Sequence, residues 1–253
     1  MFAAQELSRD LFLGGRLRLL QPVKGYRAGI DPVLLAAAVP ARTGESALEL
    51  GLGAGVASHC LAARVPGLVL AGLELQPDYA ALARANAECN HVALEVVEGD
   101  VAGMPAALKA RRFDHVLMNP PYFAGGRPPA ADLGREAGRG GALPLAAWVE
   151  AAARRLVPGG WLTVIQRAER LPALLAALEG RLGCTEVLPV APRAGRPARL
   201  VILRARQGRR GPFRLLAPLV LHEGAHHERD GESFGPAAQA VLREGAALLF
   251  RTS

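Results

Sequence analysis

A short motif of chemical interest, Asn-Pro-Pro-Tyr at 119–122, follows an apolar run at 116–118 and precedes Phe123. Proline fixes φ and donates no backbone hydrogen bond, so two consecutive prolines make a rigid turn at the end of a strand. Asn119 therefore holds its side-chain amide in a fixed position, with the aromatic rings of Tyr122 and Phe123 next to it. Two interpretations follow: a clamp for a flat polar group, or a stiff turn with a partly buried tyrosine.

A glycine-rich loop follows an earlier apolar run. The sequence ELGLGAG contains Gly51, Gly53 and Gly55. A dinucleotide-binding loop would need its last glycine where Val56 stands, so the spacing that cradles a pyrophosphate is absent. The glycines still let backbone approach a ligand closely. Glu49, just before the first glycine, favours a ligand with a cationic or amine-bearing end.

Two more acids end the next apolar runs. Glu74 lies about twenty residues past the loop, where dinucleotide folds place the acid that accepts both ribose hydroxyls. Asp100 is placed to accept a hydrogen bond from an adenine amino group. Leu75 and Val101 are assigned to the same site. Each acid alone is more typical of a solvated strand end. Together, a ribose, an adenine and a cationic amino-acid tail describe S-adenosylmethionine (SAM), the predicted cofactor.

The elements that position these residues alternate along the chain. Apolar strands separated by helices of about 10–15 residues predict an α/β fold with a parallel sheet covered on both faces. Ligands bind such sheets beyond the carboxyl ends of the strands, which is where the site residues fall. The predicted strands are 46–50, 68–75, 93–99, 113–118 and 161–166 with a closing pair at 187–192 and 198–205, and the helices run over 31–39, to about 65, 78–90, 145–156 and 171–182.

The chain of 253 residues is predicted to form one domain in three parts. Residues 1–40 form a hairpin around two glycines and a helix capped by Asp31, and they pack on the core. Residues 41–206 form the SAM-binding core, and residues 207–253 form a C-terminal extension. The sequence shows no signal peptide and no membrane-length apolar run, and its three cysteines lie far apart, so a cytoplasmic protein is expected.

The formal net charge of +7 favours a polyanionic partner. Basic residues concentrate between Arg193 and Arg214, where eight arginines occur without an acid. This segment predicts a surface that faces nucleic acid. The alternative is a solvated basic edge, because an arginine-rich chain can also reflect a GC-rich coding bias.

The series ELGLGAG, LELQ, EGD and NPPY resembles the class I SAM-dependent methyltransferases of the amino-methylating N-P-P-Y type. The segments QPVKGYRAGIDPVLLAAAV, NPPYF and PLVLHEG resemble, more narrowly, the bacterial tRNA (adenine-N6) methyltransferases that modify an adenine beside the anticodon of a valine tRNA. This resemblance implies a Rossmann-like sheet of seven mostly parallel strands with an antiparallel C-terminal pair. It also implies tRNA as the partner. GYRAGID replaces a shorter Gly-Thr-Asp stretch of the described member.

The resemblance implies a mechanism for the rigid turn. The Asn119 side-chain oxygen and the Pro120 carbonyl would accept from the target amine, and the Asn119 side chain would also contact the cofactor. Tyr122 would stack on the base, with Phe123 extending the platform. Tyr26 and Arg27 would touch substrate or cofactor. The loop at 124–143 is interpreted as a lid that grips RNA, the alternative being plain disorder.

Other acceptors stay open: a base in ribosomal RNA or DNA, or a glutamine side chain in a protein. A SAM-binding protein that interacts with RNA without catalysis is the alternative outside the enzymes. A match to the zinc motif H-E-x-x-H begins at His222, but the preceding strand-like residues and Gly224 argue against the helix that this motif needs. No metal is therefore expected, and the sequence does not predict an oligomeric state.

Overall fold

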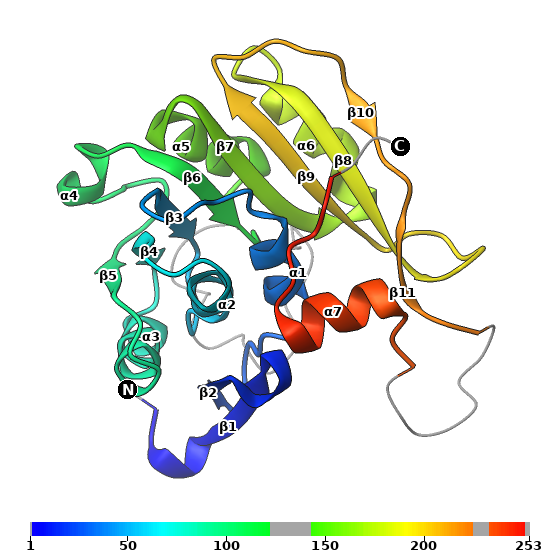
Figure 1. Cartoon of the computed structure of the whole chain (residues 1–253). Helices are drawn as coiled ribbons and strands as arrows, with labels where there is room; N and C mark the ends of the chain where they lie inside the picture. Colours follow the sequence, from blue (N-terminus) through cyan, green and yellow to red (C-terminus); the bar gives the residue numbers. More distant parts are fainter. Residues whose placement is uncertain (1, 122–142, 225–232, 251–253) are drawn as a thin grey trace.

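The structure, a computed structural model, describes residues 2–121, 143–224 and 233–250. Within these residues one nine-stranded sheet crosses the molecule (Figure 1). Its strands are β3 Ser46–Leu50, β4 Val69–Glu74, β5 Leu94–Glu98, β6 Phe113–Met118, β7 Leu156–Arg167, β8 Leu182–Arg193, β9 Leu200–Gln207, β10 Arg214–Leu215 and β11 Leu219–His222. Their order is β10-β8-β9-β7-β6-β3-β4-β5, and β11 also pairs with β8.

The predicted α/β fold is confirmed, and the strand count is corrected. Strands β3 to β9 form the expected seven. Strand β9 is antiparallel to its neighbours β7 and β8, and the other six strands are parallel to one another. The two further strands, β10 and β11, both run parallel to β8. They have two and four residues, too few for the alternation that identifies a strand in sequence.

Helices cover both faces of the sheet, and each face has its own hydrophobic cluster. Residues of β6 alternate between the clusters, Leu117 in one and Val116 and Met118 in the other, as the period of a strand requires. Helices α1, α2 and α7 supply one cluster and α4, α5 and α6 the other. The helices are α1 Asp31–Ala38, α2 Val56–Arg64, α3 Pro77–Cys89, α4 Ala106–Lys109, α5 Leu145–Arg155, α6 Leu171–Leu178 and α7 Pro236–Glu244.

Three predicted element ends are corrected. Strand β7 begins directly after α5, so Pro158-Gly159-Gly160 lies inside a strand rather than after a helix. The pairing with β6 shifts register there, a bulge that Gly160 permits because an added Cβ would lie 2.9 Å from the Asp114 carbonyl oxygen. Asp31 is the first residue of α1 rather than its N-cap. Helix α6 ends at Leu178, four residues early.

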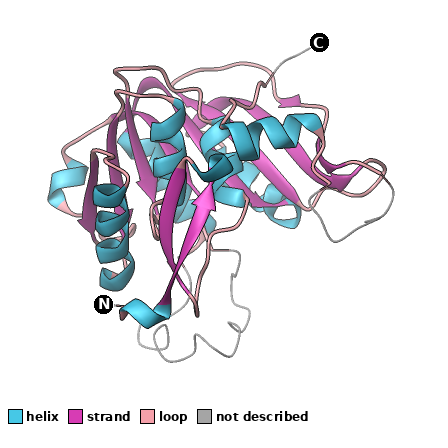
Figure 2. Ribbon diagram, turned by 60° about the horizontal axis from the view of Figure 1, so that its bottom comes forward, coloured by secondary structure: helices cyan, strands magenta, loops and turns pink. Residues whose placement is uncertain are grey.

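The N-terminal hairpin stands apart from the main sheet (Figure 2). Short 3₁₀ turns precede and join its strands, β1 Leu7–Phe12 and β2 Leu17–Pro22. The buried Asn86 of α3 docks it, because its side chain accepts from the Leu20 N–H (2.7 Å) and donates to the Leu20 carbonyl (3.0 Å). The same amide donates to the carbonyl of Ala54 in the glycine loop. The hairpin is thus bonded, through one side chain, to the loop predicted to hold the cofactor.

None of the helices described above is both long and apolar enough to cross a membrane. The division of the chain at residues 40 and 206 stays a prediction.

Candidate active site

The sheet brings the glycine loop and its neighbouring acid together. Gly51, Gly53 and Gly55 all have positive φ, of 72°, 56° and 82°, which glycine adopts without strain. The Gly53 N–H donates to Glu74 Oε2 at 2.7 Å. Glu74 is buried at the end of β4, and this burial raises its pKa. Because an ionised carboxylate has about four acceptor positions, Glu74 can still accept from a diol.

Glu49 is a buried carboxyl group at the floor of the same loop. It is 4% exposed, and the Ser58 backbone N–H and hydroxyl both donate to its Oε2, at 2.9 and 2.6 Å. Burial raises the pKa of Glu49 to about 8, with a smaller contribution from Glu74, while the Ser58 hydrogen bonds oppose the rise. A buried acid of this kind is stabilised in its ionised form by a cation.

The raised pKa makes stability depend on pH. The folded protein keeps the Glu49 proton up to about pH 8, whereas the unfolded chain loses it near the ordinary value of 4.5. The contribution of Glu49 to the free energy of unfolding is therefore complete below pH 4.5. It declines as pH rises towards 8, by up to about 1.4 kcal/mol per pH unit. We expect urea unfolding at pH 5 to 9 to show wild type losing stability relative to Glu49→Gln. If the stability difference between wild type and Glu49→Gln did not change with pH, the raised pKa of Glu49 would be contradicted.

The acceptor end of the site follows β6, the strand next to β3. Asn119 comes directly after β6, and its side-chain Oδ1 is buried without a hydrogen-bond partner among the described residues. A buried acceptor without a partner costs free energy, so it marks a position where a donor from outside the protein would be stabilised. The Pro120 carbonyl, one residue on, accepts from the side chain of Gln166 at 3.2 Å.

Gln166 is a site residue that the sequence analysis missed. It lies near the end of β7, is 0% exposed and donates through Nε2 to the Pro120 carbonyl. Its Oε1 accepts from the Arg167 N–H at 2.8 Å, which fixes the orientation of the amide. A polar residue in an otherwise apolar strand end was the available signal. Gln166 therefore holds one of the two predicted acceptors in place.

Tyr26 lies between the two ends of the site. A Cβ built on Gly53 would be 3.7 Å from the Tyr26 ring, and Tyr79 donates to the Tyr26 carbonyl at 3.0 Å. The residue as a whole is 51% exposed, but its phenol hydroxyl is buried and lies near acids. Burial, then Asp31 and Glu49, raises its pKa to about 12, against an opposing hydrogen bond from Asn119. The phenol therefore stays neutral, which makes it a hydrogen-bond donor rather than a base.

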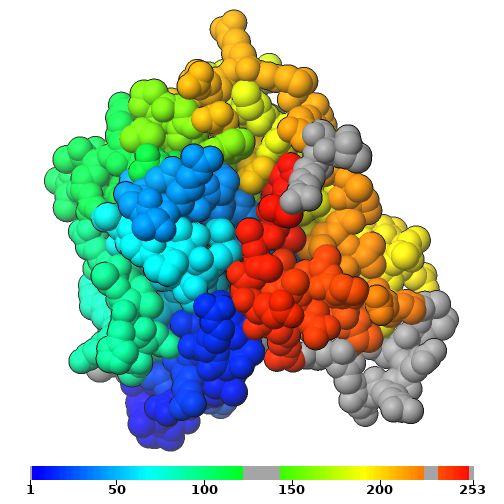
Figure 3. Space-filling view, in the orientation of Figure 1, coloured from blue at the N-terminus to red at the C-terminus, as the bar shows by residue number. Residues whose placement is uncertain are grey.

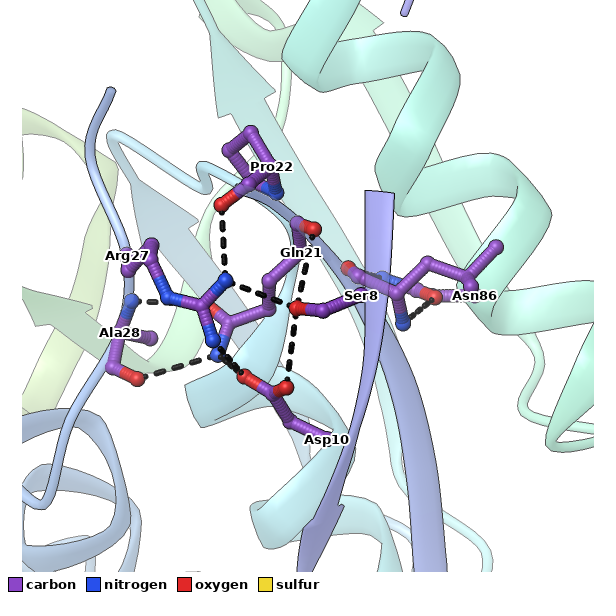
Figure 4. A network of polar contacts seen from close by, with 8 residues as sticks. Ser8, Asp10, Gln21, Pro22, Arg27, Ala28 and Asn86 are labelled. Carbon is purple, nitrogen blue, oxygen red and sulfur yellow. Dashed lines mark hydrogen bonds and ion pairs between the residues drawn. The ribbon is translucent and has the colours of Figure 1, made fainter. Parts of the chain in front are cut away.

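Arg27 binds residues of the N-terminal hairpin (Figure 4). Its guanidinium donates to Asp10 and the Ser8 hydroxyl, both at 2.7 Å, and to the Pro22 carbonyl at 2.9 Å. These bonds position the segment that carries Tyr26. A role for Arg27 in binding substrate stays a prediction that no contact supports.

The remaining predicted site residues fall into two groups. Asp100 lies next to Glu74, because the Gly99 N–H donates to the Glu74 carbonyl at 2.8 Å. Leu75 is 47% exposed beside it, and Val101 is buried. Tyr122, Phe123 and most of the loop at 124–143 lie outside the described residues, so their predicted roles stay predictions.

Comparison with known proteins decides the family. The model of the methyltransferase small domain family matches residues 30–189, more than half of the chain. The chain belongs to this family. A tRNA1(Val) (adenine(37)-N6)-methyltransferase of Dickeya chrysanthemi is 30% identical over 226 residues, which cover 86% of this chain and 87% of the relative. The predicted resemblance to the N-P-P-Y methyltransferases is confirmed.

Solved structures agree with this family. A predicted O-methyltransferase from Agrobacterium tumefaciens superposes with a TM-score of 0.71 at 28% identity, over 86% of this chain and 98% of that one. A 16S rRNA N2 G1207 methyltransferase from T. thermophilus, solved with SAM and guanosine, has a TM-score of 0.54 at 21% identity, over 79% and 50% of the two chains. The second likeness shows a shared fold.

The protein is therefore a SAM-dependent methyltransferase, and its loop fits that cofactor. The three glycines with positive φ leave backbone open to a ligand, as their spacing predicted. Burial raises the pKa of Glu49, and the cationic amino-acid end of SAM would stabilise the ionised carboxylate. Glu74 and Asp100, on neighbouring strand ends, would accept from the ribose and the adenine.

The arginine-rich segment of this methyltransferase does not form one surface, which corrects the sequence-based prediction. Arg204 is buried against Glu186, and Arg214 binds the other oxygen of the same carboxylate. Arg193 is buried with its guanidinium on the carbonyls of residues 223 and 224, and Arg206 binds the Gly159 carbonyl. Four of the eight arginines thus bind other parts of the fold.

The H-E-x-x-H match begins on a strand rather than a helix. His222 is the last residue of β11, and its ring stacks on Phe234 with centroids 4.8 Å apart. The second histidine of the motif, His226, lies outside the described residues. Among residues that the structure describes, no three His, Cys, Asp or Glu side chains gather as metal ligands would.

Proposed function

We propose that this methyltransferase transfers a methyl group from SAM to the N6 amino nitrogen of an adenine in tRNA, near the anticodon. The observation that carries the proposal is the buried Asn119 Oδ1, which has no hydrogen-bond partner among the described residues and lies next to the Pro120 carbonyl. A single-stranded anticodon loop presents a base for such a pocket at low unstacking cost. The relative from Dickeya chrysanthemi carries this activity in its name, which supports the choice of acceptor.

The chain's own residues orient the amine. An exocyclic amino group is a poor nucleophile, because its lone pair is delocalised into the ring. Hydrogen bonds from both its hydrogens, to Asn119 Oδ1 and the Pro120 carbonyl, favour a pyramidal nitrogen with its lone pair directed at the methyl group. The bound cofactor supplies that electrophilic methyl. Because the prolines and Gln166 fix both acceptors beforehand, the transition state needs little reorganisation.

Three aromatic residues are proposed to contact the target base or the cofactor. Tyr122 stacks on the target base, and Phe123 extends the stacking surface. The neutral phenol of Tyr26, between the glycine loop and Asn119, contacts cofactor or base. We place the enzyme in the cytoplasm, in line with a tRNA substrate.

A labelled-SAM assay tests the acceptor. Purified protein is incubated with total tRNA, total ribosomal RNA, DNA and a release factor, and the labelled products are analysed by nucleoside and peptide mass spectrometry. The proposal expects N6-methyladenosine in tRNA from cells that lack the enzyme. Label only in ribosomal RNA, DNA or glutamine would assign another acceptor. SAM binding without label in any of them would favour the non-catalytic RNA-interaction alternative.

Gln166 gives a prediction about positioning. We expect Gln166→Leu to lower kcat roughly tenfold, the effect of losing one buried hydrogen bond of about 1.4 kcal/mol, with SAM affinity unchanged. In Gln166→Glu only a protonated carboxyl group can donate to the Pro120 carbonyl. Its kcat should therefore fall as pH rises through a pKa that burial raises, over a range where wild type keeps its rate.

Thr163 offers a matched control in the same strand. It is 0% exposed, and its hydroxyl binds no described residue, so Thr163→Val should keep kcat near wild type. A pH profile of Gln166→Glu parallel to that of wild type would contradict the positioning role.

A further inference from the structure

The carboxyl edge of the sheet carries acids on one half and arginines on the other. Strand β6 lies in the middle of the sheet. Strands β3, β4 and β5 follow on one side of it, and strands β7, β9 and β8 follow on the other. Acids stand at or near the carboxyl ends of the first three strands, and the segments at the same edge on the other side carry exposed arginines. From one end of the edge to the other, the residues are Asp100, Glu74, Glu49, Asn119, Arg167, Arg199 and Arg196.

Strand directions place these arginines on the edge of the active site. Strand β7 is parallel to β6, and β9 is antiparallel to β7, so β9 begins where β7 ends. Hydrogen bonds link the turn before β9 to the active site through β7. Gln166 binds the Pro120 carbonyl, and two residues later the Ala168 N–H donates to the Arg199 carbonyl at 2.9 Å. The turn at 194–199, between β8 and β9, is therefore joined to the acceptor end of the site.

Two arginines of this turn remain available to a partner. Arg196 and Arg199 are exposed, and neither guanidinium has a hydrogen bond or ion pair with another described residue. The nearby Arg167 pairs loosely with Glu169 at 3.9 Å. Arg209 and Arg210 are equally exposed but follow the other end of β9, at the opposite edge of the sheet. Figures 1 and 3 show the two segments far apart, the turn (yellow) at the right and the 208–213 loop (orange) at the top.

We propose that the backbone of the RNA substrate binds the turn at 194–199, with Arg196 and Arg199 on its phosphates, while the target base reaches Asn119. The inference rests on the proposed function and names the surface that it uses. A polyanion is attracted by the exposed arginines beyond β6 and finds no such cations on the side of β3 to β5 among the edge residues named above, so the distribution of charge along the edge orients it. Arginine binds phosphate through a planar pair of donors, which suits this contact.

Two double variants of equal charge test the surface. Arg196→Ser/Arg199→Ser should weaken binding of an unmodified tRNA transcript about tenfold, measured by fluorescence anisotropy. The slope of log affinity against log salt should fall by about 1.4, roughly 0.7 for each single-strand phosphate contact. Arg209→Ser/Arg210→Ser should bind tRNA nearly as wild type does. Both variants should keep SAM affinity and melting temperature, and the first should raise KM for tRNA with kcat nearly unchanged.

Equal weakening by the two variants would overturn the proposal, since it would show an effect of net charge alone. Unchanged binding by the first variant would also overturn it. The acceptor assay reports separately on the function. If label appears only in protein while the first variant alone loses tRNA affinity, the proposed acceptor fails and the RNA surface stands.

Discussion

Replacing Asn119 with alanine should lower kcat for methyl transfer by roughly 10²–10³-fold, the range found when one fixed polar group is removed from a preorganised site. The physical reason is the loss of the buried Oδ1, which has no partner among the described residues and is free to accept from the amine. The measurement is single-turnover transfer to the RNA identified by the acceptor assay. SAM affinity should weaken far less, because Glu49, Glu74 and the glycine loop are untouched.

Asn119→Asp separates acceptor chemistry from a structural role. This variant keeps an acceptor oxygen at the Oδ1 position and replaces the amide NH2 with a second carboxylate oxygen, so it should retain more activity than Asn119→Ala. Equal rates for wild type and a folded, SAM-binding Asn119→Ala would rule out this asparagine as an acceptor of the target amine. Melting temperatures of all three proteins provide the control for folding.

The second large effect concerns stability. Glu186→Ala should lower the free energy of unfolding by about 3–5 kcal/mol, the cost of leaving a buried charge unpaired. Arg204 is 9% exposed, pairs with Glu186 at 2.5 Å and lies 3.6 Å above the Phe250 ring. Arg214 binds the same carboxylate at 2.8 Å, so the one substitution removes the partner of two guanidinium groups.

Urea unfolding measures this effect, and Glu98→Ala is the matched control. Glu98 pairs with Arg84 at 2.7 Å, but both side chains are more than 40% exposed. Exposed pairs contribute about 0–1 kcal/mol, so the control should stay near wild type. Similar losses for the two variants would contradict the structural role of Arg204, and would return it to the candidates for RNA binding.

The fold could be predicted from sequence because short, mainly apolar strands alternate with helices of about 10–15 residues along the chain. The glycines and acids after these strands were predictable for the same reason, since parallel strands bring their carboxyl ends to one edge. The bulge in β7 was not predictable. Proline and two glycines are typical of a turn after a helix, and only the pairing partner, Asp114 on β6, shows that they lie within a strand.

Side-chain direction explains what the sequence left open in the site. Tyr26 and Arg27 are neighbours, yet one reaches Gly53 and the other binds Asp10 on the hairpin. A charge pattern also does not reveal burial. Glu186, seven residues before the arginine-rich segment, is the acid that pairs with Arg204 and Arg214, and only tertiary structure brings them together.

The docking of the hairpin by Asn86 has a consequence for the energetics of cofactor binding. Asn86 bonds the hairpin at Leu20 and the glycine loop at Ala54, so opening of the hairpin removes a support of that loop. If an ordered hairpin strengthens SAM binding through this loop, bound SAM stabilises the hairpin against opening by the same free energy, because coupling between two equilibria is reciprocal. The amide of Leu20 becomes a reporter of cofactor occupancy, readable by hydrogen exchange.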